Sequence, residues 1–183
     1  MSISDITTFE VKSTNDLRPT LENELVKLRP LEELDFSALY EAANDPLLWA
    51  GHPSKDRYKK EVFEAWFKDA LASNSALVIL DKAQNRVIGS TRFYYYQPHF
   101  SEIAIGYTFI SRSHWGGRFN KAVKSLMLDY AFQFVNKVWF HIDPSNIRSQ
   151  MATKKLGAVY SHTDQLDSVL YDWFELPKSA WIG

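Results

Sequence analysis

Residues 108–134 read TFISRSHWGGRFNKAVKSLMLDYAFQF, and the interpretation of the whole chain starts from this stretch. Its apolar residues recur every three or four positions, which places them on one side of a helix. The residues of this stripe are Phe119, Ala122, Val123, Leu126, Met127, Tyr130, Ala131 and Phe134. The spacing therefore predicts a long amphipathic helix that packs against a core.

Two glycines, Gly116 and Gly117, stand immediately before this helix. Without a Cβ they let the backbone turn sharply, so several N–H groups at the positive end of the helix dipole can face outward. Such a turn can bind an anion. The basic residues nearby are Arg112, His114, Arg118, Lys121 and Lys124. A plain turn into a core helix with a solvated basic edge is the alternative, and the loop alone leaves both readings open.

Composition limits the class of protein. The 183 residues are enough for one domain with a substantial core, and residues 1–183 are predicted to form that domain. The formal net charge of -1 gives no general attraction to nucleic acid or anionic lipid. The absence of cysteine excludes disulfides, thiolate metal sites and a cysteine nucleophile, and no metal site is predicted. Because neither a signal peptide nor an apolar run of about 18 residues is found, we expect a cytoplasmic protein without membrane contact.

The order of predicted elements indicates a mixed α+β fold. Strands are predicted at 25–28, 76–80, 87–96, 102–110, 138–142, 158–162 and 168–175, and helices at 32–43, 55–71, 119–134 and 146–156. Residues 1–20 read as a tail with one short edge strand at 7–11, and residues 177–183 as a C-terminal tail. We therefore expect a largely antiparallel sheet of six or seven strands with helices on both faces.

Two segments in this order resemble the acetyl-CoA-binding motifs of the GCN5-related N-acetyltransferases (the GNAT family), most closely the ribosomal-protein N-terminal acetyltransferases. The first is IGYTFISRSHWGG at 105–117, followed by a helix that contains LMLDYAF. The second is DPSNIRSQMATKKLGA at 143–158. The resemblance covers roughly residues 21–175, and it implies the acyl-CoA N-acyltransferase fold with acetyl-CoA (coenzyme A) as cofactor.

The resemblance also implies a set of binding residues. The strand ending near Ile110 would pair its backbone with the pantetheine arm, the loop 116–121 would cradle the diphosphate, and Asn146 would contact the arm. Ser149 would donate a proton to the departing thiolate, although a serine that bonds its own helix backbone is the alternative. The implied cofactor-binding residues are Thr108, Phe109, Ile110, Gly116, Gly117, Arg118, Phe119, Asn120, Lys121, Asn146 and Ser149.

The sequence departs from the family pattern at three positions. Arg118 and Asn120 stand where the family carries glycine or another small residue, and the glycines come earlier in this chain. Asn tolerates left-handed backbone and Arg118 can add a charged contact, so we expect the anion site to persist in altered form. Ala104 stands where relatives often have glutamate. A base at that position is therefore excluded.

Acetyl transfer from a thioester to an amine requires a deprotonated amine, a donor for the developing negative oxygen and a proton for the thiolate. A bulge near residues 107–109 could free a backbone N–H for the second role. For the base we predict a water-linked route through Glu102 and His141, because histidine titrates near neutrality. A partly buried His141 that only bonds backbone is the alternative.

The resemblance places the amine acceptor at the loop 49–53, the second predicted helix, residues 94–96 and the closing hairpin. The candidate wall for a cationic amine consists of Trp49, His52, Tyr94, Tyr96 and His99. The same rings could equally be core packing. The basic group of Lys55, Arg57, Lys59 and Lys60 reads as a solvated helix face, and its alternative role is to face an acidic acceptor.

The leading functional hypothesis is an N-acetyltransferase that acts on a primary amine, either a protein N-terminus or a small molecule. The second is a CoA-binding module of the same fold that has lost catalysis. The third is a nucleotide-binding protein unrelated to CoA, which the separate Asn-x-x-Ser segment disfavours. The sequence leaves open which amine is acetylated, which acyl chains fit, and whether the protein forms a homodimer.

Overall fold

The computed structural model describes residues 16–183, and it contains one mixed sheet with helices on both faces. The strands are β1 (Leu21–Glu22), β2 (Val26–Pro30), β3 (Ala76–Asp81), β4 (Arg86–Gln97), β5 (Glu102–Ile110), β6 (Lys137–Ile142), β7 (Val159–Leu166) and β8 (Val169–Pro177). Their order is β1-β2-β3-β4-β5-β6-β8-β7. The predicted α+β class is confirmed, with eight strands instead of six or seven because β1 adds a two-residue edge strand. The edge strand predicted at 7–11 lies outside the described residues.

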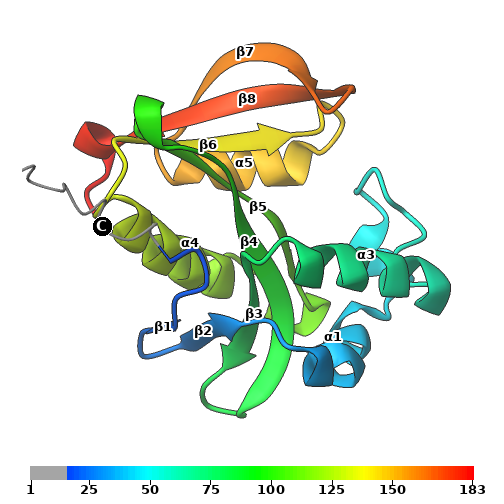
Figure 1. The fold of residues 1–183 in the computed structure, drawn as a ribbon. Coiled ribbons are helices and arrows are strands. Elements are labelled where there is room, and N and C mark those ends of the chain that lie inside the picture. The colour runs from blue at the N-terminus through cyan, green and yellow to red at the C-terminus, as the bar shows by residue number, and fades with distance from the viewer. Residues whose placement is uncertain (1–15) are drawn as a thin grey trace, which may run out of the picture.

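The helices form two layers (Figure 1). They are α1 (Phe36–Ala43), α2 (Pro46–Trp49), α3 (Lys60–Ala72), α4 (Arg118–Ala131) and α5 (Ile147–Lys155), with 3-10 turns η1 (Glu33–Asp35), η2 (Pro98–Phe100), η3 (Arg112–His114) and η4 (Lys178–Ala180). Residues of α4 share a core with Leu77 and Ile110, whereas residues of α1 and α3 share a second core with Val78 and Phe109. Because successive strand residues face opposite sides, the two cores lie on opposite faces of the sheet. No helix in residues 16–183 is long and apolar enough to cross a membrane.

Two predicted helices begin later than expected. The helix predicted at 32–43 begins with η1 and becomes α-helical at Phe36, and the helix predicted at 55–71 begins at Lys60. The segment between these two predicted helices contains the short α2, which Asp45 caps by accepting a hydrogen bond from the Leu47 N–H at 2.9 Å. The segment 50–59 therefore remains a loop that crosses from α2 to α3.

The parallel strands β5 and β6 separate soon after they begin. They pair over three positions, Glu102 with Lys137, Ile103 with Val138 and Ala104 with Trp139. Beyond Ala104, β5 continues to Ile110 without sheet pairing to β6. Figure 1 shows β6, β8 and β7 turned away from the earlier strands. This separation exposes one edge of β5 next to the beginning of α4.

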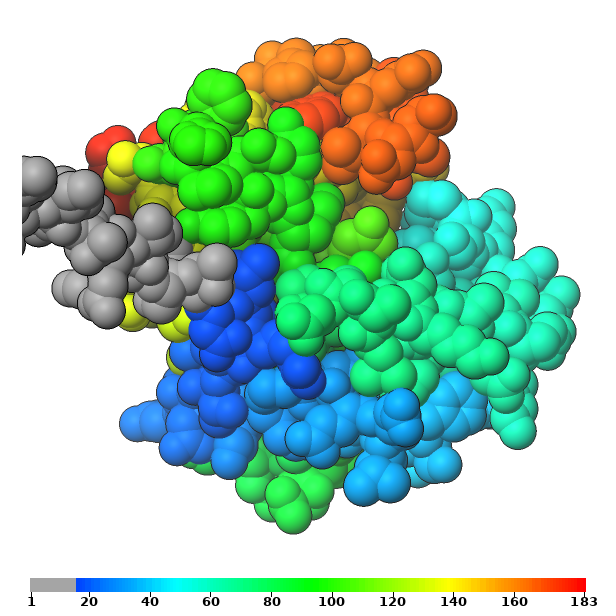
Figure 2. Space-filling model, in the orientation of Figure 1, coloured from blue at the N-terminus to red at the C-terminus, as the bar shows by residue number. Residues whose placement is uncertain are grey.

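A third apolar cluster covers the C-terminal half of the sheet, on the side opposite α4 and α5. It consists of Ala104, Trp139 and Trp173, with Tyr94, Tyr95, Leu166 and Tyr171 packed around it. Figure 2 shows the cyan segment before α3 close to the orange C-terminal hairpin, with the green of β5 between them. This aromatic surface is where the loop 50–59 and the separating strands come together.

Candidate active site

The glycine loop has the predicted backbone conformation. Gly116 has φ 113° and Gly117 has φ 91°, values that strongly favour glycine. Helix α4 follows without a side-chain cap, and its Lys121 N–H bonds the Gly117 carbonyl at 2.8 Å. The N–H groups that precede Lys121 belong to the first turn, which has no intrahelical acceptor. The start of α4 therefore presents a row of N–H donors at the positive end of its dipole.

Most of the basic residues predicted around this loop are engaged elsewhere. Arg112 pairs with Asp45, and the imidazole of His114 is buried and lies 3.2 Å from the Asp81 carboxylate. The Lys124 ammonium is buried on the sheet side of α4. Arg118 and Lys121 remain exposed at the helix start. Of the five basic residues near the loop, Arg118 and Lys121 are therefore the two that remain available to an anion at the start of α4.

A further cation, missed by sequence reasoning, lies beside the loop. The guanidinium of Arg148 in α5 stacks over the Trp115 ring at 4.0 Å from the centroid. Trp115 is held in place by its indole N–H, which donates to the Ile110 carbonyl at 2.9 Å. Burial lowers the pKa of Arg148 without discharging it at neutral pH. The N-terminal ends of α4 and α5 thus approach each other through Arg148 and Trp115.

Asn146 is the N-cap of α5. Its side-chain oxygen accepts a hydrogen bond from the Ser149 N–H at 3.2 Å. Asn146 therefore has a structural role as a helix cap, besides the ligand contact that the family resemblance implies. The side-chain nitrogen has no partner among residues 16–183, so it can still donate to a ligand.

A bulge interrupts β5 next to the separating strands. Ser90 pairs with Phe109 and Arg92 with Gly106, so Tyr107 and Thr108 together oppose one residue of β4. Tyr107 has φ 51°, which is rare for a residue with a bulky side chain. A bulge of this kind withdraws backbone groups from the ladder. The sequence predicted it at residues 107–109, and the structure contains it there.

His141 contacts Tyr94 on the aromatic side of the sheet. Its Nδ1 shares a hydrogen bond with the Tyr94 hydroxyl at 3.0 Å, and its Nε2 is buried without a partner among the described residues. Burial, with a smaller effect from His162, lowers the pKa of His141 to about 4, so the ring is neutral at pH 7. Burial also raises the pKa of Tyr94, which keeps the phenol protonated. Both groups are therefore neutral at pH 7, and the Tyr94 hydroxyl can donate to an unprotonated Nδ1 of His141.

Glu102 is not brought together with His141. Its carboxylate accepts from the Trp139 indole at 2.9 Å and pairs with Lys137 at 3.3 Å. Because Glu102 pairs with Lys137, His141 stands four residues further along β6, roughly 13 Å at the usual rise of a strand. Glu102 thus stabilises the paired end of β5 and β6, and the predicted water-linked route through both residues has no support in this geometry.

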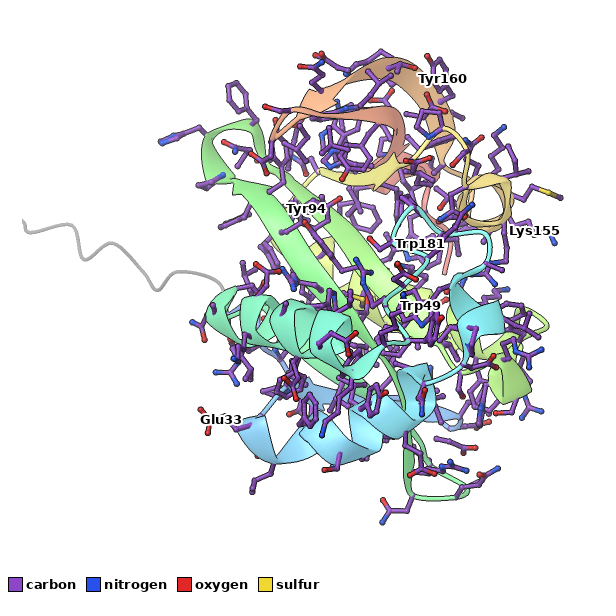
Figure 3. All side chains as sticks on the ribbon, turned by 90° about the vertical axis from the view of Figure 1, so that its right-hand side faces the viewer. Glu33, Trp49, Tyr94, Lys155, Tyr160 and Trp181 are labelled. Atoms are coloured by element: carbon purple, nitrogen blue, oxygen red, sulfur yellow. The ribbon has the colours of Figure 1, made fainter. Side chains whose placement is uncertain are left out.

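The predicted acceptor wall is only partly formed. Trp49 is buried in the core, with its indole N–H bonded to the Ala43 carbonyl at 2.8 Å. Tyr96 lies on the opposite face, where its ring contacts Phe134 at 5.9 Å. The reason is a second bulge in β4 after Tyr94, which reverses the alternation of side chains. Figure 3 looks onto the face that carries Tyr94 and Trp49.

His52 is half-buried against Trp49, and its Nδ1 accepts from the Ser54 N–H at 2.9 Å. Burial, with contributions from the nearby Arg57 and Arg148 cations, lowers the pKa of His52 to about 4. The imidazole is therefore neutral at pH 7. Because Nδ1 is an acceptor, the proton of the neutral ring lies on Nε2. His52 can thus donate one hydrogen bond at the mouth of the site.

A cavity of about 480 Å³ lies elsewhere, between the end of α1, β4 and the segment that follows β5. The ion pairs Arg86–Glu41 and Arg112–Asp45 line it. None of the residues predicted to bind cofactor or acceptor lines this cavity. The candidate site is instead an open surface along β5.

The comparisons with known proteins agree with this geometry. Residues 26–159 match the family described as Acetyltransferase (GNAT) domain. This match covers well over half of the 183-residue chain, so the protein belongs to the GNAT acetyltransferase family. No curated protein matches the chain.

Solved structures share the fold at low sequence identity. A GCN5-related N-acetyltransferase from Brucella melitensis is 18% identical, covers 90% of this chain and 80% of its own, and superposes with a TM-score of 0.80. Spermidine N-acetyltransferase from Vibrio cholerae, solved with CoA and spermine, is also 18% identical, with coverages of 86% and 98% and a TM-score of 0.64. A proposed ribosomal-protein-serine acetyltransferase from Vibrio cholerae is 11% identical, with coverages of 86% and 97% and a TM-score of 0.71. These similarities support the fold and leave the acceptor open.

Proposed function

We propose that this protein transfers an acetyl group from acetyl-CoA to a primary amine by direct attack. The proposal rests on one observation: two features suited to parts of coenzyme A lie side by side. The start of α4 offers N–H donors from a left-handed glycine turn, and the adjoining β5 has an edge that is unpaired beyond Ala104. A diphosphate suits the first feature, and an extended chain with amide groups suits the second.

The residues present fit coenzyme A. The first turn of α4, with Arg118 and Lys121 exposed beside it, would hold the diphosphate. The edge of β5 at 108–110 would pair with the pantetheine arm, and the free side-chain nitrogen of Asn146 would donate to it. Arg118 and Asn120, which replace small residues of the family pattern, are accommodated because the two glycines before them make the turn.

Bound acetyl-CoA supplies the thioester. The bulge at Tyr107 provides backbone N–H groups that can stabilise negative charge on an oxygen. The Tyr94 hydroxyl accepts a proton from the attacking amine while passing its own to Nδ1 of His141, the one titratable partner it has in residues 16–183. Ser149, in the first turn of α5, would pass its hydroxyl proton to the thiolate and take another from water, so that no alkoxide remains.

Two questions need a test: which class of amine accepts the acetyl group, and whether the protein is catalytically active. Ala104 removes the family carboxylate and Glu102 is held in an ion pair, so a CoA-binding protein without activity is the alternative. The structural neighbours include enzymes for a small polyamine and for ribosomal protein, and both acceptor types belong in the assay.

The deciding experiment measures free CoA thiol after acetyl-CoA is mixed with peptides, polyamines, amino sugars and amino acids. Titration calorimetry with CoA runs alongside it, on the native protein and on Gly117→Pro and Arg118→Ala. We expect turnover with at least one amine, and weaker CoA binding in both variants. Binding without turnover on any amine would establish the inactive module. Unchanged CoA affinity in both variants would remove the assignment of the loop.

A further inference from the structure

Arg57, in the loop between α2 and α3, is a half-buried cation with no carboxylate partner among residues 16–183. Its guanidinium lies over the Trp49 ring at 5.1 Å and beside the Trp66 ring at 5.9 Å. Its one hydrogen bond to the described residues goes from Nη2 to the Ser54 hydroxyl at 3.0 Å. Its Nε is buried with no acceptor. Most of the donor fork of this arginine therefore has no acceptor among residues 16–183.

Such an arrangement is unfavourable in an isolated protein. Buried charges are normally paired, because the loss of hydration must be offset by a counter-ion or by hydrogen bonds. Burial lowers the pKa of Arg57 to about 10, so the group still carries its charge at pH 7. The two tryptophan rings offset part of the cost through cation–π contacts. They offer no acceptor for Nε.

Arg92, a neighbouring arginine, differs from Arg57 because it is paired with a carboxylate. Both terminal nitrogens of Arg92 bond the Asp69 carboxylate at 3.1 Å, and the Arg92 guanidinium lies over the Tyr107 ring at 4.2 Å. Asp69 is thereby committed to Arg92. Arg92 and Asp69 shift the pKa of Arg57 in opposite directions, so their ion pair does not neutralise the positive charge of Arg57.

Arg57 also lies at the end of the site where the acceptor must approach. Tyr107 on the β5 bulge and Tyr171 on β8 are near enough to influence its pKa. The Tyr107 ring in turn contacts the Tyr94 ring at 5.1 Å, and Tyr94 bonds His141. Arg57 is therefore connected to the proposed proton acceptor through Tyr107, whose ring contacts Tyr94.

We propose that the amine acceptor carries a carboxylate, and that this carboxylate binds the unused fork of Arg57. The inference rests on the proposed acetyl transfer and names its substrate class. A planar guanidinium matches two carboxylate oxygens, and it keeps this geometry while stacked on an aromatic ring. The same unpaired charge on Arg57 repels a polyamine. The acceptor therefore differs in charge from the spermine bound in the Vibrio cholerae structure.

The test compares acceptors that differ only in this group. Methionine, phenylalanine and glutamate are assayed against their α-amides, and amidated tetrapeptides with glutamate at the second position against those with glutamine. The first set locates the carboxylate next to the amine, and the second places it on a peptide side chain. Spermidine is the cationic comparator. The variants are Arg57→Gln, Arg57→Lys, and Lys55→Gln as a matched exposed control on the same loop.

We expect the native protein to prefer one carboxylate set over its amides at least tenfold in kcat/KM. Arg57→Gln should lose about 10- to 100-fold on the carboxylate and little on the amide, because a charge-assisted bond is removed. Arg57→Lys should keep part of the preference for the carboxylate, and Lys55→Gln should keep all of it. Equal rates on acids and amides in the native protein, or an unchanged preference in Arg57→Gln, would overturn the proposal.

Acetyl-CoA binding, measured by calorimetry on every variant, separates this inference from the proposed function. If the native protein binds no acetyl-CoA, the proposed function fails. If it binds but does not turn over, N-acetylmethionine and its amide are titrated into the CoA complex. Tighter binding of the acid in native protein, lost in Arg57→Gln, supports the carboxylate site, and equal binding of acid and amide refutes it.

Discussion

The hydroxyl of Tyr94 and Nδ1 of His141 lie 3.0 Å apart although β5 stands between their strands in the sheet. The contact is possible because β5 carries Gly106 where the tyrosine crosses it. A Cβ at Gly106 would lie 2.8 Å from Cε1 of the Tyr94 ring. The His141 ring is held from its other side by Trp173, with ring centroids 3.8 Å apart. One hydrogen bond thus connects the two parts of the sheet that separate after Ala104.

The first prediction concerns this bond in catalysis. Tyr94→Phe and His141→Gln should each lower kcat at pH 7 by at least tenfold, since a positioned base contributes a factor of about 10² to 10⁴. The loss should shrink at high pH, where the acceptor amine deprotonates unaided. Steady-state rates between pH 6 and 9 measure this, with Tyr96→Phe as the control because that ring packs on the other face. Flat, native-like profiles in both variants would exclude the pair as proton acceptor.

Gly106 provides the second prediction. Gly106→Ala should reduce the free energy of unfolding by about 1 to 3 kcal/mol, the usual cost of overpacking, because its Cβ meets the Tyr94 ring at 2.8 Å. Denaturant unfolding gives the value. In the double variant with Tyr94→Leu, the clash should be absent and the two costs should not add. Simple additivity would mean that the strand is destabilised by something other than the Tyr94 ring.

Short-range sequence patterns correctly predicted those parts of the fold that depend on residues close together in the chain. The apolar stripe gave α4, and the paired glycines gave the two left-handed residues before it. The faces on which the side chains of β4 lie were harder to predict, because an alternating sequence pattern does not show where a bulge reverses the alternation. Tyr96 was therefore assigned to the wrong face.

The burial of charged side chains could not be predicted from the sequence, for a different reason. A lysine or arginine in sequence gives no sign of whether its head group reaches water, and long stems allow either outcome. Arg57 has three exposed lysines near it in sequence, yet its own side chain is half-buried against the rings of Trp49 and Trp66. Lys124 has the spacing of a core position in α4, and its burial followed that spacing rather than its charge.

The third prediction distinguishes the two roles of Asn146, as the helix cap and as a ligand contact. Asn146→Ala removes the oxygen that accepts from the Ser149 N–H, so the free energy of unfolding should fall by about 0.5 to 2 kcal/mol. Asn146→Asp keeps a cap oxygen but replaces the free side-chain N–H donors. It should therefore retain stability while weakening CoA binding in calorimetry. Normal CoA affinity in Asn146→Asp would leave Asn146 with the cap alone.

The last prediction concerns Lys124, whose ammonium lies between the separating strands. Its Nζ donates to the Thr108 hydroxyl on β5 at 2.7 Å and lies 5.6 Å from the Phe140 ring centroid on β6. No carboxylate pairs with it among residues 16–183. Burial lowers the pKa of Lys124 to about 7. The unperturbed value of lysine is about 10.4, so the folded state disfavours the charged form.

The sign of the resulting pH dependence follows from proton counts. Between about pH 7 and pH 10 the unfolded chain carries a proton on Lys124 that the folded protein has largely lost. Unfolding then takes up a proton, so the contribution of this residue to folding stability rises with pH, by at most about 1.4 kcal/mol per unit. Lys124→Met keeps the aliphatic stem and removes the charge. It should raise the free energy of unfolding at pH 7 by about 1 to 4 kcal/mol, the range found when buried ionic groups are replaced by apolar ones.

Urea unfolding of native protein and Lys124→Met at pH 6, 7, 8 and 9 measures the difference directly. The two stability curves should converge as the pH rises, because the free energy needed to remove the Lys124 proton on folding falls as the pH approaches the unfolded pKa. Lys121→Met, an exposed residue one turn earlier in α4, is the matched control and should run parallel to the native curve. A constant gap between native protein and Lys124→Met across this range would show that Lys124 keeps an ordinary pKa in the folded state, and that its burial is compensated by contacts other than Thr108.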